Sequence, residues 1–217
     1  FTTNVHSGYA AGNNTSTAST WVEVVANKLG VLISPHEVGF GAASVKCPAN
    51  NATCTGYGQG GSRVTDPNGI GKAGGALTVP MVTQIANHNT RFTGFGAGDL
   101  VFVWGGNNDA FVQLGAVGAG VAPATAMANM SAAATELVAL VKDQLVAKGA
   151  QRVAVVNLPD ASQTPGFAGL DAPTKGLLSQ LSAQFNTTLA AGLSGVAQAR
   201  IIDARGLELS ADKTWAA

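Results

Sequence analysis

Three short runs of apolar, mostly β-branched residues lie in the second half of the chain. They are the segments 99–104, 152–157 and 200–203. Continuous apolar runs, as opposed to alternating ones, are typical of strands buried on both faces of a parallel sheet. We therefore expect each run to form one strand of a single sheet.

Between these runs, apolar residues recur at helical spacing. In the segment 123–148 they include Leu137 and Leu145, and Gly149 follows as a stop signal. Residues 173–193 have the same amphipathic pattern. Strand, helix, strand, helix, strand is the order of a parallel sheet covered by helices, so the pattern predicts an α/β fold.

Two helices are predicted in the first half of the chain. Thr20 and Glu23 form a capping-box pattern, which predicts a helix over 20–29. Thr78 is expected to cap a second helix that ends near Arg91.

The segment 39–76 separates these two helices. It is rich in glycine and has no periodicity, so we expect a long loop with one short strand near 55–59. It contains Cys47 and Cys54, with six residues between them. A polar loop gives cysteine no packing role, so a small disulfide formed in an oxidising compartment is favoured, and two free thiols are the alternative. A metal site would need more ligands than His36, and we expect neither a metal nor a cofactor.

Length and charge limit the functional classes. A chain of 217 residues fits one domain over 1–217. Charged residues make up 11% and the twelve basic residues balance the twelve acidic ones, so no basic surface for nucleic acid is predicted. The sequence contains no run of about 18 consecutive apolar residues, so no membrane span is predicted. We expect a neutral or small molecule as the partner.

A first candidate for chemistry is the segment 105–109, Gly-Gly-Asn-Asn-Asp, which follows a predicted buried strand. Ligands of open parallel sheets bind beyond the carboxyl ends of the strands. An Asn held there can aim its amide N–H at a developing negative charge. An ordinary turn is the alternative, since these residue types are common turn formers.

A second candidate is the segment 58–63, Gly-Gln-Gly-Gly-Ser-Arg. Its consecutive glycines expose backbone N–H groups that could bind an anion. Neither the dinucleotide fingerprint nor a phosphate-loop lysine is present, and a flexible loop explains the segment equally well when it is taken alone.

Together and in this order, the two segments resemble blocks of the SGNH (GDSL) family of ester hydrolases. Tyr57-Gly-Gln-Gly-Gly61-Ser is similar to the second block, and Gly61 matches the glycine whose backbone N–H joins the oxyanion hole. Val103-Trp-Gly-Gly-Asn-Asn108-Asp is similar to the third block, so Asn108 matches the side-chain donor. Segments at 1–4 with 21–24, and at 156–160 with 164–165, are similar to connecting segments of the long-chain, autotransporter-like bacterial branch.

The resemblance implies a flavodoxin-like, three-layer α/β/α sandwich with a parallel sheet. It also implies a serine esterase or lipase that acts on a small-molecule or lipid ester, with Gly61 and Asn108 as its catalytic oxyanion donors. No cofactor is implied. The protein is expected to be secreted, periplasmic or on the cell surface.

Two blocks of the family have no counterpart in this sequence. The Gly-Asp-Ser-Leu block with the nucleophile is expected before residue 1, and the Asp-any-any-His block after residue 217. The chain would then be the central portion of a larger domain and incomplete as an enzyme. Any membrane association is expected only through segments outside this chain.

No residue of the chain is an evident replacement. His6, His36 and His88 have no Asp two or three residues before them, so we expect solvated or structural roles. Ser62 and Ser162 could lie near the pocket rim, but a nucleophilic serine needs an adjacent base. Two other functions stay open: a non-catalytic binding module of the same fold, and an esterase for acetylated sugars.

Overall fold

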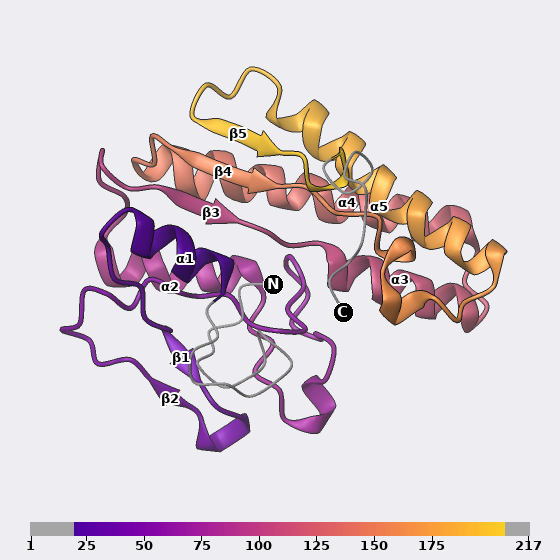
Figure 1. Cartoon of the computed structure of the whole chain (residues 1–217), viewed down its shortest axis with the longest axis horizontal. Coiled ribbons are helices and arrows are strands. Elements are labelled where there is room, and N and C mark those ends of the chain that lie inside the picture. Colours follow the sequence, from indigo (N-terminus) through magenta and orange to yellow (C-terminus); the bar gives the residue numbers. More distant parts are fainter. Residues whose placement is uncertain (1–19, 207–217) are drawn as a thin grey trace. The chain divides into compact units, whose positions relative to one another are not determined.

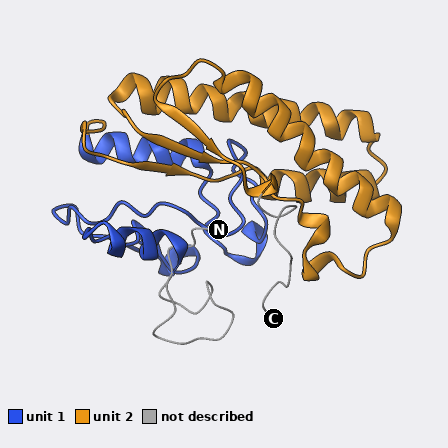
Figure 2. Cartoon of the chain, turned by 45° about the horizontal axis from the view of Figure 1, so that its top comes forward, with its two compact units in different colours: residues 1–92 blue, residues 93–217 orange. Residues whose placement is uncertain are grey.

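The computed structural model describes residues 20–206. They belong to two compact units, 1–92 and 93–217, which are coloured separately in Figure 2. The predicted parallel sheet lies in the second unit, and the cysteine-containing loop lies in the first.

The sheet of the second unit consists of β3 (Val101–Val103), β4 (Val153–Val156) and β5 (Ala199–Ile202). The strands are parallel and lie in the order β3-β4-β5. The central strand β4 carries the buried valines of the predicted run, including Val155, which is 0% exposed. The α/β class and the parallel sheet are therefore confirmed. The first strand is shorter than predicted, because Asp99 ends a turn in which its carboxylate accepts the N–H of Gly96.

Three helices connect and cover these strands. They are α3 (Asn107–Gly118), α4 (Pro123–Ala139) and α5 (Ala172–Leu193), and α4 continues as π- and 3-10-helical turns to Lys148. When parallel strands follow one another in the same direction across a sheet, right-handed crossovers place the connecting helices on the same face. The strand order is β3-β4-β5, and α4 and α5 lie together on one face of the sheet in Figure 1. The core between them is filled by fully buried side chains, among them Met130, Leu137, Leu178, Leu181, Phe185 and Leu189.

The helical stretch Pro123–Lys148 is long and apolar enough to cross a membrane by length and composition. Inside the structure, 44% of the residues in its most apolar part are buried. We treat it as a core helix because the side chains of Leu137 and Leu145 fill the interior.

The described part of the first unit has little regular structure. It contains α1 (Trp21–Lys28), the antiparallel pair β1 (Glu37–Val38) and β2 (Val45–Lys46), and α2 (Met81–Phe92). The predicted strand near 55–59 is wrong: within it only Gly56 pairs, in an isolated bridge.

The capping box of α1 is confirmed. The Oγ1 of Thr20 accepts the N–H of Glu23 at 3.3 Å, and the Glu23 carboxylate accepts the N–H of Thr20 at 2.6 Å. These two bonds satisfy donors that have no acceptor within the helix.

The predicted capping role of Thr78 is wrong. Thr78 lies three positions before Met81, the first residue of the helix, and has a positive φ of 42°. The helix begins after Pro80, whose carbonyl accepts the N–H of Gln84 at 3.0 Å. Propensity favours Thr as a cap, but at this position its side chain is packed against neighbouring glycines.

The disulfide between Cys47 and Cys54 is confirmed. Arg91, in the last turn of α2, donates to the carbonyl oxygens of Cys47, Pro48 and Asn51. One guanidinium therefore ties the disulfide loop to the end of α2.

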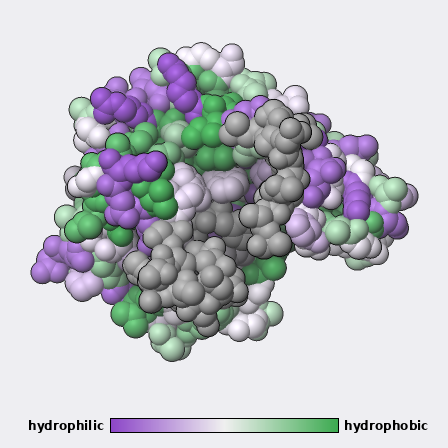
Figure 3. Space-filling view, in the orientation of Figure 1, coloured by the Kyte–Doolittle hydropathy of each residue, from purple (hydrophilic) through white to green (hydrophobic). Residues whose placement is uncertain are grey.

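The surface mixes residue types. On the face drawn in Figure 3, hydrophobic and hydrophilic residues are interspersed, in keeping with the low and balanced charge. Several large apolar side chains of the first unit are nevertheless exposed, including Leu29, Val31, Leu32, Phe40 and Val45.

Candidate active site

Asn108 lies in the first turn of a helix at the carboxyl end of β3. The chain leaves the strand through Trp104, Gly105 and Gly106, and α3 begins at Asn107. We expected a turn or loop at this point, so the helix is a finding that sequence reasoning missed. Its consequence is electrostatic, because the first turn of a helix carries a partial positive charge that stabilises an anion.

Gly106 makes this abrupt turn possible. It has a φ of 107°, which L-residues with side chains rarely adopt, and its carbonyl accepts the N–H of Ala110 at 3.0 Å. A Cβ at this position would lie 2.6 Å from the ring of Phe185, which is fully buried. The start of α3, and Asn108 with it, is therefore fixed against the core of the unit.

Gly61 lies in a second tight turn, in the first unit. Its φ is 78°, and a Cβ there would collide with the carbonyl oxygen of Ile70. The Gly61 carbonyl accepts the N–H of Ile70 at 2.9 Å. Among residues 20–206, no group accepts a hydrogen bond from the N–H of Gly61. A fixed peptide whose N–H is unused in this way can donate to a bound anion.

The structure therefore describes each predicted donor within its own unit: Gly61 in the first and Asn108 in the second. Both lie in glycine-dependent turns, and both are half-buried. Their assignment as oxyanion donors stays a prediction.

A polar cluster, whose hydrogen-bond partners the sequence did not predict, lies beyond the carboxyl end of β4. Asp160 is 4% exposed, and its carboxylate accepts the hydroxyls of Ser162 at 2.7 Å and Ser179 at 2.6 Å. Arg205, which follows β5, completes it with an Nη2–Oδ2 distance of 3.3 Å to Asp160. Ser179 and Arg205 are 19 and 45 positions from Asp160 in the chain, so their contacts leave no local signal in the sequence.

A second set of bonds joins the ends of β4 and β5. The Asn157 side chain donates to Asp203 at 2.7 Å and accepts the N–H of Arg205 at 3.2 Å. The N–H of Gly206 and the Asn157 amide lower the pKa of the Asp203 carboxyl, because both hydrogen bonds favour its charged form. The cluster thus holds the chain in place where it leaves the sheet.

Ser162, considered above as a rim residue, is 5% exposed and belongs to this cluster. Its hydroxyl donates to a carboxylate, and residues 93–217 contain no histidine that could serve as its base. Its position therefore favours a structural role.

His36 and His88 lie in the first unit and pack against the ring of Tyr57. The ring centroids are 4.7 Å and 5.6 Å from that of Tyr57, and His88 also contacts Phe92. Burial, and then the charge of Arg91, lower the pKa of His36. Burial raises the pKa of Tyr57 to about 12. These contacts agree with the structural role predicted for both histidines, and His6 lies outside the described residues.

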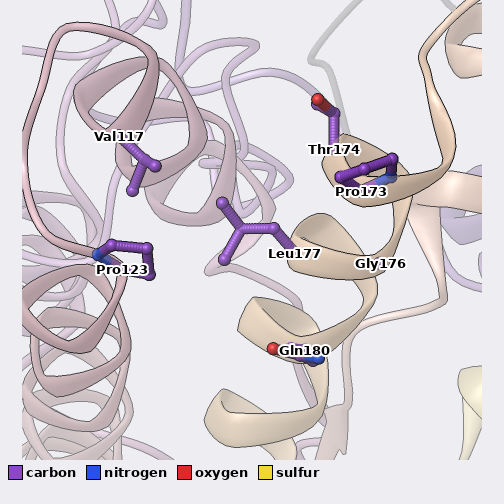
Figure 4. A pocket seen from close by; sticks show the side chains of 7 residues that line it. All are labelled: Val117, Pro123, Pro173, Thr174, Gly176, Leu177 and Gln180. Carbon is purple, nitrogen blue, oxygen red and sulfur yellow. The ribbon is translucent and has the colours of Figure 1, made fainter.

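An open apolar groove of about 530 Å³ lies where α3, α4 and α5 come together (Figure 4). Leu177 projects from α5 toward Val117 and Pro123, and Gln180 is a polar residue at its edge. Val117 is nine residues beyond Asn108, or about 13 Å along a helix axis. The groove contains no charged residue and neither of the predicted donors.

Comparison with known proteins adds no assignment: no protein-family model matches this chain, and no curated protein matches it.

Proposed function

We propose that this chain supplies the oxyanion hole of a serine carboxylic ester hydrolase of the SGNH type. Gly61 and Asn108 are the two donors. The observation that supports this most is the position of Asn108, in the first turn of a helix just beyond the carboxyl end of a parallel strand. That is where α/β folds bind ligands and where a negative charge is stabilised.

The proposed chemistry is acyl transfer. A serine hydroxyl attacks the ester carbonyl and a histidine takes its proton, then returns it to the leaving alcohol as the acyl-serine forms. Water, deprotonated by the same histidine, then attacks the acyl-serine, which releases the acid and restores the serine hydroxyl. In this proposal, both groups come from segments that flank the 217 residues. The carbonyl oxygen becomes an oxyanion, and it accepts hydrogen bonds from the N–H of Gly61 and from the Asn108 amide. Such donors accelerate the reaction because they bind the charge that develops in the transition state.

The fold proposed for the complete domain is the three-layer α/β/α sandwich. The described sheet has helices α4 and α5 on one face. Parallel sheets are normally covered on both faces, so a second helical layer is part of the proposal.

The test uses the full-length protein that contains this sequence, with p-nitrophenyl esters as substrates. We expect hydrolysis that a phosphonate ester abolishes, together with one covalent phosphonate on a serine in a flanking segment. A protein that neither hydrolyses these esters nor reacts with the phosphonate contradicts the proposal and favours a binding module. A serine hydrolase that prefers acetylated sugars over the p-nitrophenyl esters keeps the mechanism and changes the substrate class.

A further inference from the structure

Side-chain hydrogen bonds connect the turn at Gly61 to the segment 78–84 of the same unit. The Gln59 side chain accepts the N–H of Val79 at 2.9 Å. The Gln84 Nε2 donates to the Val79 carbonyl at 2.7 Å and to the Ser62 hydroxyl at 3.3 Å. Gln84 thus connects Ser62, the residue after Gly61, to Val79 in the segment that precedes α2.

Two backbone hydrogen bonds continue this attachment. The N–H groups of Met81 and Val82 donate to the carbonyls of Arg63 and Val64, at 3.0 and 3.1 Å. The first N–H groups of a helix have no acceptor within the helix, so the segment after Gly61 acts as the cap of α2. This explains how α2 begins without the predicted Thr78 cap.

Thr78 is strained where it meets Gly61. It is 1% exposed with a φ of 42°, and among residues 20–206 its hydroxyl has no hydrogen-bond partner. Its Cγ2 lies so close to Gly61 that a Cβ on that glycine would be 2.9 Å away, and a Cβ on Gly69 would lie 2.5 Å from the Cβ of Thr78. A β-branched residue with positive φ persists only where its surroundings hold it, and such strain clusters at functional sites.

We propose that Thr78 and Gln84 are positioning residues that fix the direction of the Gly61 N–H in the oxyanion hole. This inference rests on the proposed function of Gly61. Neither residue touches the substrate; both act through the peptide of Gly61.

Positioning matters here because the donor must reach a charge that exists only in the transition state. An oxyanion donor works at about 2.7–3.1 Å from the oxygen, and displacement of a reacting group by about 1 Å can cost roughly a hundredfold in rate. A loosened Gly61 therefore lowers kcat and leaves KM nearly unchanged, because the neutral ester carbonyl gains less from the bond.

The test combines kinetics with amide resonances in the full-length protein. Gln84→Met keeps the length of the side chain and removes its two hydrogen bonds. We expect kcat to fall about tenfold at nearly constant KM, and the Gly61 amide resonance to shift. Thr83→Ala is the matched control, since Thr83 is exposed on the same helix and should change neither quantity.

A pair of Thr78 variants separates packing from a role of the hydroxyl. Thr78→Val keeps the methyl group that contacts Gly61 and should retain kcat, whereas Thr78→Ser removes that methyl group and should lower it. The reverse order, with Ser active and Val impaired, overturns the inference because the hydroxyl would then be the functional group.

The outcome also separates this inference from the proposed function. If the parent protein hydrolyses esters but Gln84→Met leaves both kcat and the Gly61 resonance unchanged, the positioning role is overturned and the esterase stands. If the parent protein has no esterase activity, the proposed function fails and this inference fails with it.

Discussion

Two glycines carry the geometry of the candidate site at the scale of single residues. Gly106 turns the chain from β3 into α3 against the Phe185 ring, and Gly61 turns the loop under the Ile70 carbonyl. Both have positive φ, and at both a side chain would meet atoms that cannot move easily. The two turns therefore depend on glycine for space as well as for backbone conformation.

Gly106→Ala should destabilise the protein strongly. The added methyl group meets Phe185 and the backbone is forced into a strained region, so we expect a loss of about 2–4 kcal/mol in the free energy of unfolding. Gly115→Ala is the control: Gly115 lies within α3, a Cβ there meets nothing within 4 Å, and the variant should gain up to about 1 kcal/mol in the free energy of unfolding. Urea denaturation measures both, and equal stability of the two variants would show that the Gly106 turn is not constrained.

Asn108→Ala addresses the chemistry of the same turn. Loss of one oxyanion donor typically lowers turnover by about 100- to 1,000-fold, and on the proposed function we expect a fall of this size in the full-length protein with the fold intact. Asn27→Ala, at an exposed position of α1, should leave kcat unchanged. Steady-state kinetics and circular dichroism check the two variants, and an unaltered kcat for Asn108→Ala removes this residue from the mechanism.

At the scale of elements, long periodic segments were predicted well. The helix after Pro123, the helix up to Leu193 and the strand at 153–156 agree with the structure because burial dictates their patterns. The helix α3 was missed, since Gly115 and Gly118 weaken a helical pattern that packing against α4 and α5 nevertheless supports.

The candidate site was predictable only in part. The motifs single out Gly61 and Asn108 as candidate donors, because glycine and asparagine leave a local signature. The partners of these turns gave no such signal: Thr78 contacts Gly61 from 17 positions away, and Arg205 meets Asp160 from 45 positions away. Contacts of this kind arise from tertiary packing, which a single sequence does not reveal.

One helix cap gives a pH prediction at this scale. Asp171 caps α5 and accepts the N–H of Thr174 at 2.8 Å, and its hydrogen bonds to Thr174 lower the pKa of the carboxyl. Folding therefore favours the charged form of Asp171. Its contribution to the free energy of unfolding is fully present above the unfolded pKa of about 3.9, and it is lost as the pH falls through the lower pKa of the folded state.

Asp171→Asn should accordingly keep its stability at pH 7, because Asn is about as good a cap as Asp, and should lose less stability than the wild type between pH 5 and pH 2. Asp171→Ala should be less stable than the wild type at neutral pH, since it removes the helix cap itself. Thermal unfolding across this pH range checks the pair. Parallel pH curves for the wild type and Asp171→Asn would mean that this carboxylate is not linked to folding.

At the scale of the whole molecule, the described chain consists of two compact units with different sources of stability. The second unit has a buried core of apolar side chains around β4. The first has few strands, and the disulfide and the Arg91 hydrogen bonds hold its loops. We expect the two units to respond differently to reduction.

Reduction of the Cys47–Cys54 disulfide should lower stability by about 2–3 kcal/mol, as expected for a bridge that closes a short loop. Amide hydrogen exchange should increase around the bridge between Pro35 and Gly56 and stay slow in β4. Amide hydrogen exchange measured before and after reduction with dithiothreitol shows which segments lose protection. Increased exchange in β4 with no change around the disulfide would contradict the stabilising role assigned to the disulfide in the first unit.

The most direct measurement is a crystal structure of the full-length protein with a phosphonate ester bound covalently to its serine. A phosphonyl oxygen takes the place of the oxyanion. The account predicts that this oxygen lies about 2.7–3.1 Å from both the backbone nitrogen of Gly61 and the side-chain nitrogen of Asn108. An oxygen held by other groups, with Gly61 and Asn108 both turned away from it, would contradict the proposed oxyanion hole.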